Sequence, residues 1–255
     1  MLWTEDYHIH TKRCKHATGE PEAYVEQAIR LGLKEIAFTD HIPLPNGFDR
    51  AHRMDLNELD AYVNDVLNLQ KRYSEIRIRL GIEADFIDGF ESFLQKTLTD
   101  YPFEIIILSV HFLAHWPKGQ WVFKYDFPDK TIKEIYSEYL QAVKRGIETG
   151  LFNVVGHLDL IKRPGASLLK HNEAEVREVL MAAKAKNMAV EINTSGLRKA
   201  IGETYPHLSF LPLIAEYGLA VTLGSDAHAP HQVGFEFEKV AKEIGKVKGL
   251  RRAMF

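Results

Sequence analysis

Residues 6–41, DYHIHTKRCKHATGEPEAYVEQAIRLGLKEIAFTDH, contain one complete unit of secondary structure. A short β-branched and apolar run spans Asp6 to His10, an amphipathic stretch spans Pro21 to Leu31, and a second apolar run spans Glu35 to Thr39. The spacing of apolar residues changes from strand-like to helix-like and back, which is typical of a βα unit. Gly32 directly follows the amphipathic stretch, where glycine readily ends a helix. The stretch therefore predicts a strand, a helix and a second, parallel strand.

The same alternation continues along the whole chain. We expect seven strands, at Asp6–His10, Glu35–Thr39, Ile76–Glu83, Ile105–His111, Asn153–His157, Ala189–Asn193 and Ala220–Ser225. We expect seven helices, at Pro21–Leu31, Asp55–Tyr73, Phe90–Leu98, Asp129–Thr149, Asn172–Lys186, His207–Tyr217 and Val233–Ile244. Repeated βα units build a mostly parallel sheet, and one barrel-type domain commonly fills about 250 residues. No linker interrupts the pattern, so we expect a single α/β domain over residues 1–255.

Composition excludes several classes of protein. The 255 residues include 35 acidic and 32 basic side chains, giving a net charge of -3, and the basic residues form no block that suits a nucleic-acid scaffold. Cys14 is the one cysteine, and the amino end lacks the pattern of a signal peptide, so we expect a cytoplasmic protein without disulfides. The apolar stretch from Ile105 to Leu113 falls far short of the roughly 20 residues that span a membrane, so no membrane segment is expected.

Histidines and carboxylates follow every predicted strand. They are His8 and His10, Asp40 and His41, Glu83 and Asp85, His111, His157 and Asp159, Glu191 and Asn193, and Asp226 and His228. The carboxyl ends of the strands in a closed parallel barrel share one face, so these side chains should converge there. Histidine mixed with carboxylate suits zinc, manganese or iron, and the lack of a thiolate cluster argues against a structural zinc site.

The individual residues differ in how strongly they indicate a metal. His8 and His10 are two residues apart, which places both rings on one face of a strand, although a half-exposed strand has the same pattern. His111 and His157, each taken alone, fit a core histidine that hydrogen-bonds a backbone carbonyl. Glu83 ends an apolar run, where an unpaired carboxylate would be costly to bury, and a carboxylate can also bridge two ions.

The segments HIHT, CKHA, FTDH, GIEAD, SVHF, VVGHLDLI, EINTSG and GSDAH, in this order, resemble the polymerase and histidinol phosphatase (PHP) superfamily of metal-dependent phosphoesterases. The resemblance covers essentially the whole chain and implies a distorted seven-stranded (β/α)7 TIM-like barrel with three divalent transition-metal ions. It implies a first ion at His8, His10, Glu83 and Asp226, a second at Glu83, His111 and His157, and a third at His16, His41 and His228. The segments CKHA, DHIPLP, SVHFL and GHLDLIKR look most like the histidinol-phosphate phosphatase branch.

This branch implies hydrolysis of a small phosphate monoester, L-histidinol phosphate, by a metal-activated hydroxide that attacks phosphorus in line. Arg163 and Arg198 each follow a strand-end motif, and a guanidinium can bind phosphate oxygens through two hydrogen bonds, although either residue could also be a solvated surface charge. Asp40 and His231 are candidate proton donors for the leaving alkoxide, or groups that orient the ligands. For Asp40 we favour the orienting role.

Alternatives remain open at this point. The same metals would also suit a nucleotide phosphatase or exonuclease, and a non-catalytic metal-stabilised module that binds a partner protein belongs to another class. An amidohydrolase fits the H-x-H pair and the late aspartate but matches GSDAH and CKHA less well. Loop residues that would close over the alcohol, or only pack on the barrel rim, are Phe48, Asp49, Phe112, Trp116, Trp121 and Tyr125. Histidines expected on the surface are His52, His115, His171 and His207.

Overall fold

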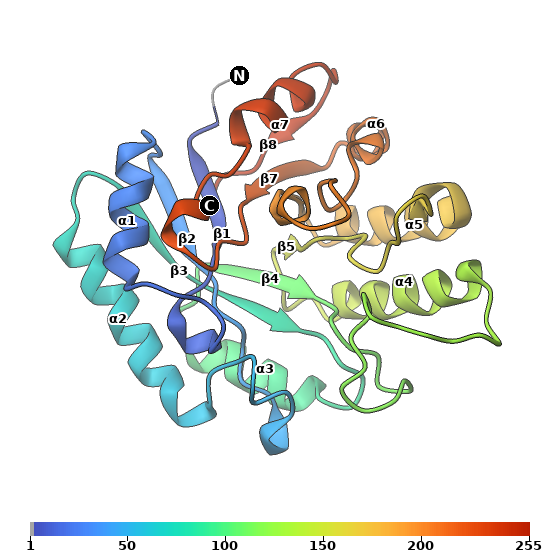
Figure 1. The fold of residues 1–255 in the computed structure, drawn as a ribbon, viewed down its shortest axis with the longest axis horizontal. Coiled ribbons are helices and arrows are strands. Elements are labelled where there is room, and N and C mark those ends of the chain that lie inside the picture. The colour runs from blue at the N-terminus through green and yellow to red at the C-terminus, as the bar shows by residue number, and fades with distance from the viewer. Residues whose placement is uncertain (1–2) are drawn as a thin grey trace.

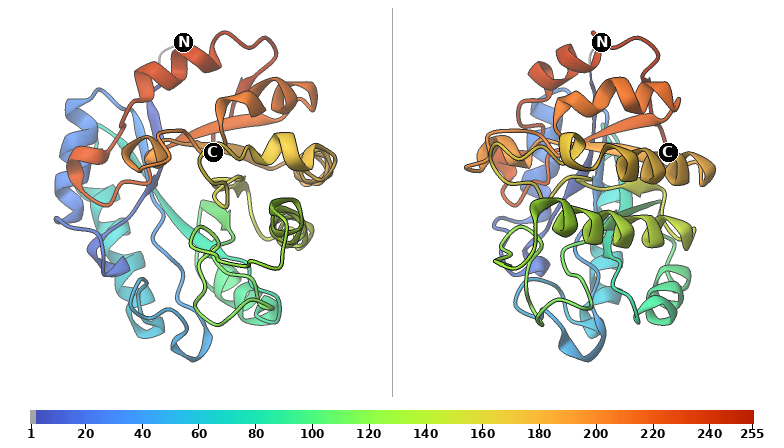
Figure 2. Two further views of the ribbon diagram at one scale, coloured as in Figure 1. Left: turned by 45° about the vertical axis from the view of Figure 1, so that its right-hand side comes forward. Right: turned by 90° about the vertical axis from the view of Figure 1, so that its right-hand side faces the viewer.

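The computed structural model describes residues 3–255, and its strands form one parallel sheet in sequence order. The strands are β1 (Glu5–Ile9), β2 (Glu35–Phe38), β3 (Arg77–Asp85), β4 (Ile105–Ser109), β5 (Val154–Val155), β6 (Ala189–Asn193), β7 (Ala220–Gly224) and β8 (Arg251–Arg252). The helices are α1 (Pro21–Arg30), α2 (Leu59–Arg72), α3 (Glu91–Asp100), α4 (Ile132–Glu148), α5 (Leu168–Ala185), α6 (Leu211–Glu216) and α7 (Phe237–Ile244). Figure 1 shows the strands at the centre with the helices around them, and Figure 2 shows the same arrangement from two further sides.

The predicted α/β barrel fold is confirmed, with local differences. The structure adds an eighth strand, β8, which is two residues long and pairs with β7. Helix α5 begins at Leu168 instead of Asn172, because the side chain of Ser167 caps it by accepting a hydrogen bond from the Lys170 N–H. Asn172 has φ of -134° and interrupts the first turns, which hid the helical start in the sequence pattern.

The sheet curls until its first strand meets the segment after β7. At the carboxyl ends of the strands, Ile9 forms a bridge with Ala227, and the His10 N–H donates to the Ala227 carbonyl at 2.9 Å. At the amino ends, β8 lies between β7 and β1, because Arg252 pairs with β7 and also donates to the Thr4 hydroxyl at 2.8 Å. The short extra strand therefore joins the sheet at the amino ends of the strands.

Side chains inside the barrel change from apolar to polar along each strand. The amino-end layer is an apolar cluster formed by Tyr7, Ala37, Ile105, Ile107, Val154, Ala189 and Ala253. On β4, the next residue on the same face after Ile107 is Ser109, and on β6 the next after Ala189 is Glu191. Ser109 and Glu191 are both buried. A β-strand points alternate residues to one face, so the polar layer lies at the carboxyl ends. A larger apolar core fills the space between the sheet and the helices.

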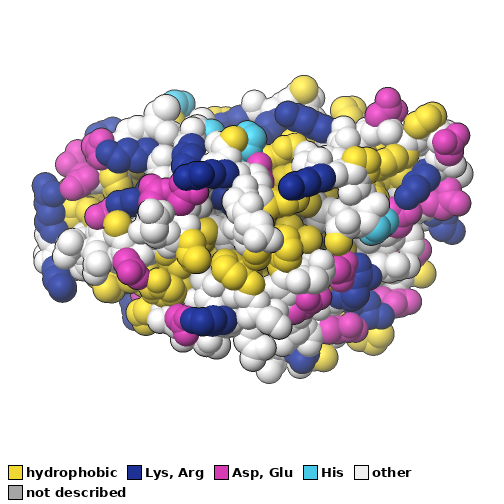
Figure 3. All heavy atoms as spheres, turned by 90° about the horizontal axis from the view of Figure 1, so that it is seen from below, with side chains coloured by type: hydrophobic (Ala, Val, Ile, Leu, Met, Phe, Trp, Pro, Cys, Tyr) yellow, Lys and Arg dark blue, Asp and Glu magenta, His cyan; other side chains and the backbone are white. Residues whose placement is uncertain are grey.

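The outer surface matches the balanced composition. On the face shown in Figure 3, basic and acidic side chains are interspersed. Among residues 3–255, no helix combines the length and the hydrophobicity that crossing a membrane would require.

Candidate metal centre

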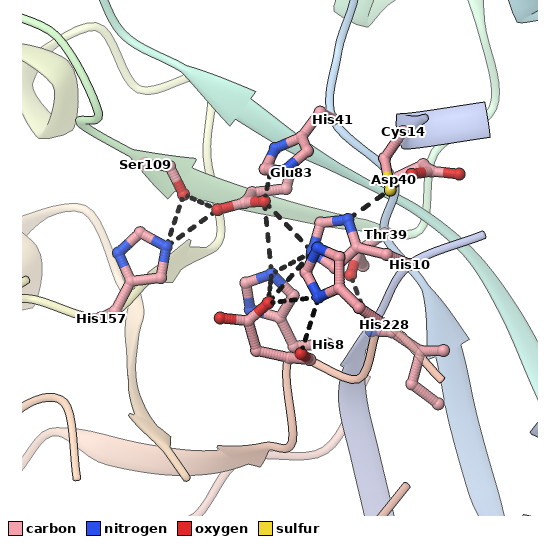
Figure 4. Close-up of polar contacts among 12 residues, drawn as sticks. His8, His10, Cys14, Thr39, Asp40, His41, Glu83, Ser109, His157 and His228 are labelled. Atoms are coloured by element: carbon pink, nitrogen blue, oxygen red, sulfur yellow. Dashed lines mark hydrogen bonds and ion pairs between the residues drawn. The ribbon is translucent and has the colours of Figure 1, made fainter. Parts of the chain in front are cut away.

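Glu83 of β3 lies at the centre of a cluster of histidines at the carboxyl ends of the strands (Figure 4). Its Oε2 atom lies 2.8 Å from His41 Nδ1 and 3.4 Å from the Nε2 atoms of both His8 and His10. The Glu83 carboxylate and the rings of His8 and His10 are at most 1% exposed. One carboxylate oxygen therefore faces three imidazoles in a fully buried space.

The other oxygen of Glu83 faces a second group. Oε1 lies 2.8 Å from His157 Nε2 and 3.7 Å from His111 Nε2, and it accepts a hydrogen bond from the Ser109 hydroxyl at 2.6 Å. Glu83 thus lies between two sets of histidines, with a different oxygen toward each. This is the arrangement that a bridging carboxylate requires.

The donor atoms on the Oε2 side have spacings that suit one metal ion. His8 Nε2 and His10 Nε2 lie 3.1 Å apart, and Asp226 Oδ1 lies 3.3 Å from His10 Nε2 and 4.0 Å from His8 Nε2. A tetrahedral zinc ion with bonds of about 2.1 Å separates its donor atoms by about 3.4 Å. The observed spacings of 3.1 to 4.0 Å bracket that value.

Three further histidines lie beside this group. The rings of His16 and His228 have centroids 4.5 Å apart, and the His41 ring lies 5.5 Å from His16 and 6.3 Å from His228. His16 and His228 each place Nδ1 near a backbone carbonyl, that of Cys14 at 2.6 Å and that of Asp226 at 3.0 Å, which leaves both Nε2 atoms free. Sets of donor atoms within 4.8 Å of one another include His10, His41 and His228, and also Cys14, His16 and His228.

Several buried polar atoms in this cluster have no hydrogen-bond partner among residues 3–255. They are Glu83 Oε2, His10 Nδ1, His41 Nδ1, His157 Nδ1 and His228 Nε2. The first three lie within ion-pair distance of an oppositely charged group, whereas His157 Nδ1 and His228 Nε2 have no such contact in the described chain. Buried polar atoms without a hydrogen bond are costly, and several in one place suit a site that binds cations. Burial lowers the pKa of His41 to about 3 and that of His228 to about 2, which keeps both rings neutral and able to bind a cation through a lone pair. The donor set therefore fits divalent metal ions.

Three buried carboxylates behind the cluster hold its rings in place. Glu191 Oε1 lies 2.6 Å from His8 Nδ1, while its Oε2 accepts from the His157 backbone N–H at 2.8 Å. Asp85 Oδ1 lies 2.9 Å from His111 Nδ1 and also accepts from the His111 N–H at 3.0 Å. A carboxylate on the far nitrogen orients a metal-binding imidazole and raises its basicity.

Asp40 is the third of these carboxylates. Its Oδ1 lies 3.5 Å from His10 Nδ1, and its Oδ2 accepts hydrogen bonds from both the backbone N–H and the hydroxyl of Thr11. Asp40 is fully buried and does not line the site cavity. These contacts favour the orienting role for Asp40 over that of a proton donor.

A bulge in β1 explains how His8 reaches the centre. The register between β1 and β2 shifts between Asp6 and Ile9. Tyr7 packs in the apolar cluster inside the barrel, yet the next side chain, His8, also reaches the interior and contacts Glu191. A bulge re-aims a side chain in this way, and strict alternation along the strand would have turned His8 outward.

Of the two arginines expected at the phosphate, only Arg198 lines the cavity. Arg198 follows β6, and its Nη2 donates to the carbonyls of Ser225 at 2.8 Å and Asp226 at 3.0 Å, while its buried Nη1 has no partner among the described residues. Arg163 is exposed, and its guanidinium stacks 3.9 Å above the Tyr125 ring and donates to the Tyr125 carbonyl. The expected phosphate contact of Arg163 is therefore not supported.

His231 also lies away from the site. It sits in a short 3-10 helix, Pro230–Gln232, where its side chain is exposed, and the cavity is lined by Gln232 instead. Gln232 Oε1 accepts from the His228 N–H at 2.8 Å. The expected proton transfer by His231 has no geometric support.

The cavity over the cluster has a volume of about 500 Å³ and includes residues that sequence reasoning missed. Besides Gln232, the lining residues that were not expected there are His52, Phe123, Lys124, Leu160, Ser195 and Lys199. His52 was expected on the surface. It belongs to the same loop after β2 as Phe48 and Asp49, which were expected near the site, so its position in that loop could have indicated that it lines the cavity. Among the expected loop aromatics, Trp121 lines the cavity, whereas Phe112 packs behind it with ring centroids 4.5 Å apart.

Comparisons with known proteins place this chain in a family. Residues 6–195 match the model of the family described as PHP domain. A relative named probable histidinol-phosphatase from Deinococcus radiodurans is 36% identical over 245 residues, covering 96% of this chain and 94% of the relative. The histidinol-phosphatase of Bacillus subtilis is 31% identical over 261 residues, covering 91% of this chain and 96% of the relative.

A solved structure has the same fold over the full chain. The histidinol phosphate phosphatase of Lactococcus lactis, complexed with zinc, L-histidinol and phosphate, superposes with a TM-score of 0.83. It is 28% identical in sequence, and the match covers 100% of this chain and 97% of that chain.

Proposed function

Because this chain belongs to the PHP domain family, we propose that its buried histidine and carboxylate cluster forms the active site of a metal-dependent phosphoric monoester hydrolase. The substrate is L-histidinol phosphate, which the enzyme splits into L-histidinol and phosphate, a step of histidine biosynthesis. The observation that carries the proposal is Glu83, whose two oxygens face separate sets of histidines beneath a cavity that also exposes Arg198. We treat residues 1–255 as one PHP-type domain.

We propose three divalent transition-metal ions, zinc, manganese or iron, as the cofactors. Their ligands would be His8, His10, His16, His41, Glu83, His111, His157, Asp226 and His228. Zinc is supported by the Lactococcus lactis relative, which was solved with zinc, and by donor spacings near those of a tetrahedral site. When bound, such ions neutralise phosphoryl charge and lower the pKa of a bound water.

The chain's own residues supply binding and orientation. Arg198 lines the cavity, and its buried Nη1 has no hydrogen-bond partner among the described residues. Its guanidinium suits the phosphoryl oxygens of the ester. Glu191, Asp85 and Asp40 hold the rings of His8, His111 and His10 from behind, so these rings need no rearrangement to bind. Leu160 and Trp121 add apolar lining to the cavity.

The test is a comparison of catalytic efficiency on L-histidinol phosphate, mononucleotides and simple sugar phosphates. We expect histidinol phosphate to give the highest kcat/KM. Treatment with a chelator should abolish activity on every ester, and added zinc, manganese or iron should restore it. If kcat/KM for a nucleotide exceeds that for histidinol phosphate by more than about tenfold, the transition states differ by about 1.4 kcal/mol. That result would overturn the assignment of the substrate but not the assignment of the enzyme as a phosphoesterase. Full activity in the metal-free protein would overturn the reaction mechanism.

A further inference from the structure

His52 lies in the loop between β2 and α2, beside the metal-type ligands but not among them. Its side chain is 43% exposed and lines the site cavity, and its Nδ1 lies 2.7 Å from Asp49 Oδ1. No hydrogen bond joins Nε2 of His52 to any residue in the described chain. If Nδ1 carries the proton and donates it to Asp49, Nε2 keeps a free lone pair.

The carboxylate that holds His52 is itself rigidly held. Asp49 Oδ2 accepts hydrogen bonds from Nη2 of Arg53 at 3.0 Å and from its Nε at 3.2 Å. Arg53 is 1% exposed, and its Nη2 also donates to Asp85 Oδ2 at 3.1 Å. Asp85 is the carboxylate that orients His111. A continuous network of hydrogen bonds therefore connects His52, through Asp49, Arg53 and Asp85, to the ring of His111.

Trp121 forms a corner with His52. The two rings meet edge to face, with centroids 5.2 Å apart and an interplanar angle of 86°, and the Trp121 ring lies 5.6 Å from the ring of His111. Behind it, Trp121 packs on Phe112. The corner is therefore an aromatic wall beside His52 Nε2, a ring nitrogen with no hydrogen-bond partner among the described residues.

The corner and Arg198 make different contacts within the site. The His52 ring neighbours that of His16, with centroids 5.7 Å apart, whereas Arg198 donates to the backbone of Ser225 and Asp226. Arg198 is a cation suited to phosphoryl oxygens, while the corner has an acceptor and ring faces. A cavity of about 500 Å³ has room for more than a phosphoryl group.

We propose that His52 and Trp121 bind the alcohol half of the substrate, so that His52 is a specificity-determining residue. The inference rests on the proposed function, in which the alcohol is L-histidinol, a compound with an amine, an imidazole and a hydroxyl group. His52 Nε2 accepts a hydrogen bond from a nitrogen of the alcohol, and Trp121 packs against its imidazole. Asp49 and Arg53 are positioning residues that act through His52.

The experiment measures the binding of the two products separately, by calorimetry with the metal-loaded enzyme. The variant is His52→Asn, whose amide can still donate to Asp49 from the position of Nδ1 but lacks Nε2. We expect L-histidinol to bind about tenfold more weakly, as loss of one hydrogen bond to a charged group implies, while inorganic phosphate binds as in the wild type. Trp121→Leu should weaken the binding of L-histidinol to a similar extent, and it serves as an independent second variant.

The matched control is His115→Gln. His115 is also a half-exposed histidine paired with a carboxylate, with Nε2 2.9 Å from Glu138 Oε2, but it does not line the cavity. It should leave the binding of both products unchanged. The role of the corner would be overturned if both His52→Asn and Trp121→Leu bind L-histidinol within about twofold of the wild type. It would also be overturned if the two variants lose affinity for phosphate to the same extent as for L-histidinol. If the wild type fails to bind L-histidinol at all, the proposed substrate fails, and this inference fails with it.

Discussion

The Nε2 atoms of His8 and His10 lie 3.1 Å apart at the fully buried centre of the barrel. The Nδ1 atoms of both rings face carboxylates, Glu191 at 2.6 Å and Asp40 at 3.5 Å. Both Nε2 atoms therefore face the same point, and Glu83 Oε2 lies 3.4 Å from each of them. A divalent ion at this point would have two imidazole nitrogens and one carboxylate oxygen within reach.

Replacement of Glu83 by alanine should cost more activity than replacement of any single histidine in the cluster. Glu83 faces both sets of histidines with different oxygens, so its loss would weaken two ion sites at once. Steady-state kcat and the metal content of the purified variants measure the effect. The control is Glu173→Ala, because Glu173 pairs with Arg177 on the exposed face of α5. Equal losses for Glu83→Ala and His157→Ala would contradict bridging.

Replacement of Arg198 by lysine should weaken the binding of inorganic phosphate about tenfold and raise KM, because lysine loses the planar fork that binds two oxygens. The metal content should not change, since Arg198 donates only to backbone carbonyls and not to a ligand side chain.

Arg163→Lys is the matched control, because Arg163 is stacked on Tyr125 outside the cavity. It should leave phosphate binding as in the wild type. If Arg198→Lys has the same kcat and KM as the wild type, Arg198 does not bind the phosphoryl group.

Replacement of Gly224 by alanine should reduce metal affinity by about 10- to 100-fold, the cost typical of losing a group that orients a ligand. An added Cβ at Gly224 would lie 2.1 Å from Glu191 Oε1 and 2.7 Å from the Cβ of His8, so Glu191 would have to leave its contact with His8. Zinc titration against a competing chelator measures this affinity.

The control for this variant is Gly245→Ala, where the nearest atom to an added Cβ, Ala241 O, is 3.3 Å away. Its metal affinity should equal that of the wild type. A Gly224→Ala protein that binds zinc normally would show that the contact between Glu191 and His8 is dispensable.

The Glu138 carboxylate should stabilise the fold in a pH-dependent way. Burial alone would raise its pKa, but hydrogen bonds from Lys130, Trp116 and His115 outweigh burial and lower the pKa to about 2. Because the pKa is lower in the folded state, the ionised carboxylate stabilises the fold, and this stabilisation is complete at pH values above the unfolded-state pKa of about 4.5. It is lost as the pH falls from about 4.5 toward about 2.

Urea unfolding of wild type and Glu138→Gln at several pH values tests this prediction. The variant should be about 1 kcal/mol less stable at pH 7, and the difference should shrink steadily below pH 4.5. A difference that stays constant down to pH 3 would show that these hydrogen bonds do not depend on the charge of Glu138.

The sequence predicted the strands and most of the helices because their signals are local. Apolar spacing and a capping glycine mark a βα unit within about 30 residues, and seven such units imply a closed parallel arrangement. Helix α5 began earlier than expected, because a side-chain cap at Ser167 and a non-helical residue at Asn172 outweighed the apolar pattern. Strand β8 has only two residues and no pattern of its own, so only its pairing with β7 defines it.

The sequence by itself determined which residue types lie at the carboxyl ends of the strands, because a parallel barrel brings all those ends to one face. Only the tertiary structure decided which of them touch. It brought Glu191 to His8 across 183 positions of the chain, re-aimed His8 through a bulge, and linked Arg53 to Asp85. It also placed His52, which was expected on the surface, at the cavity, and it left His231 outside the cavity. The physical reason is that periodicity records the face on which a side chain lies, whereas contacts depend on strand register, bulges and loop paths, which are set by packing between segments far apart in the chain.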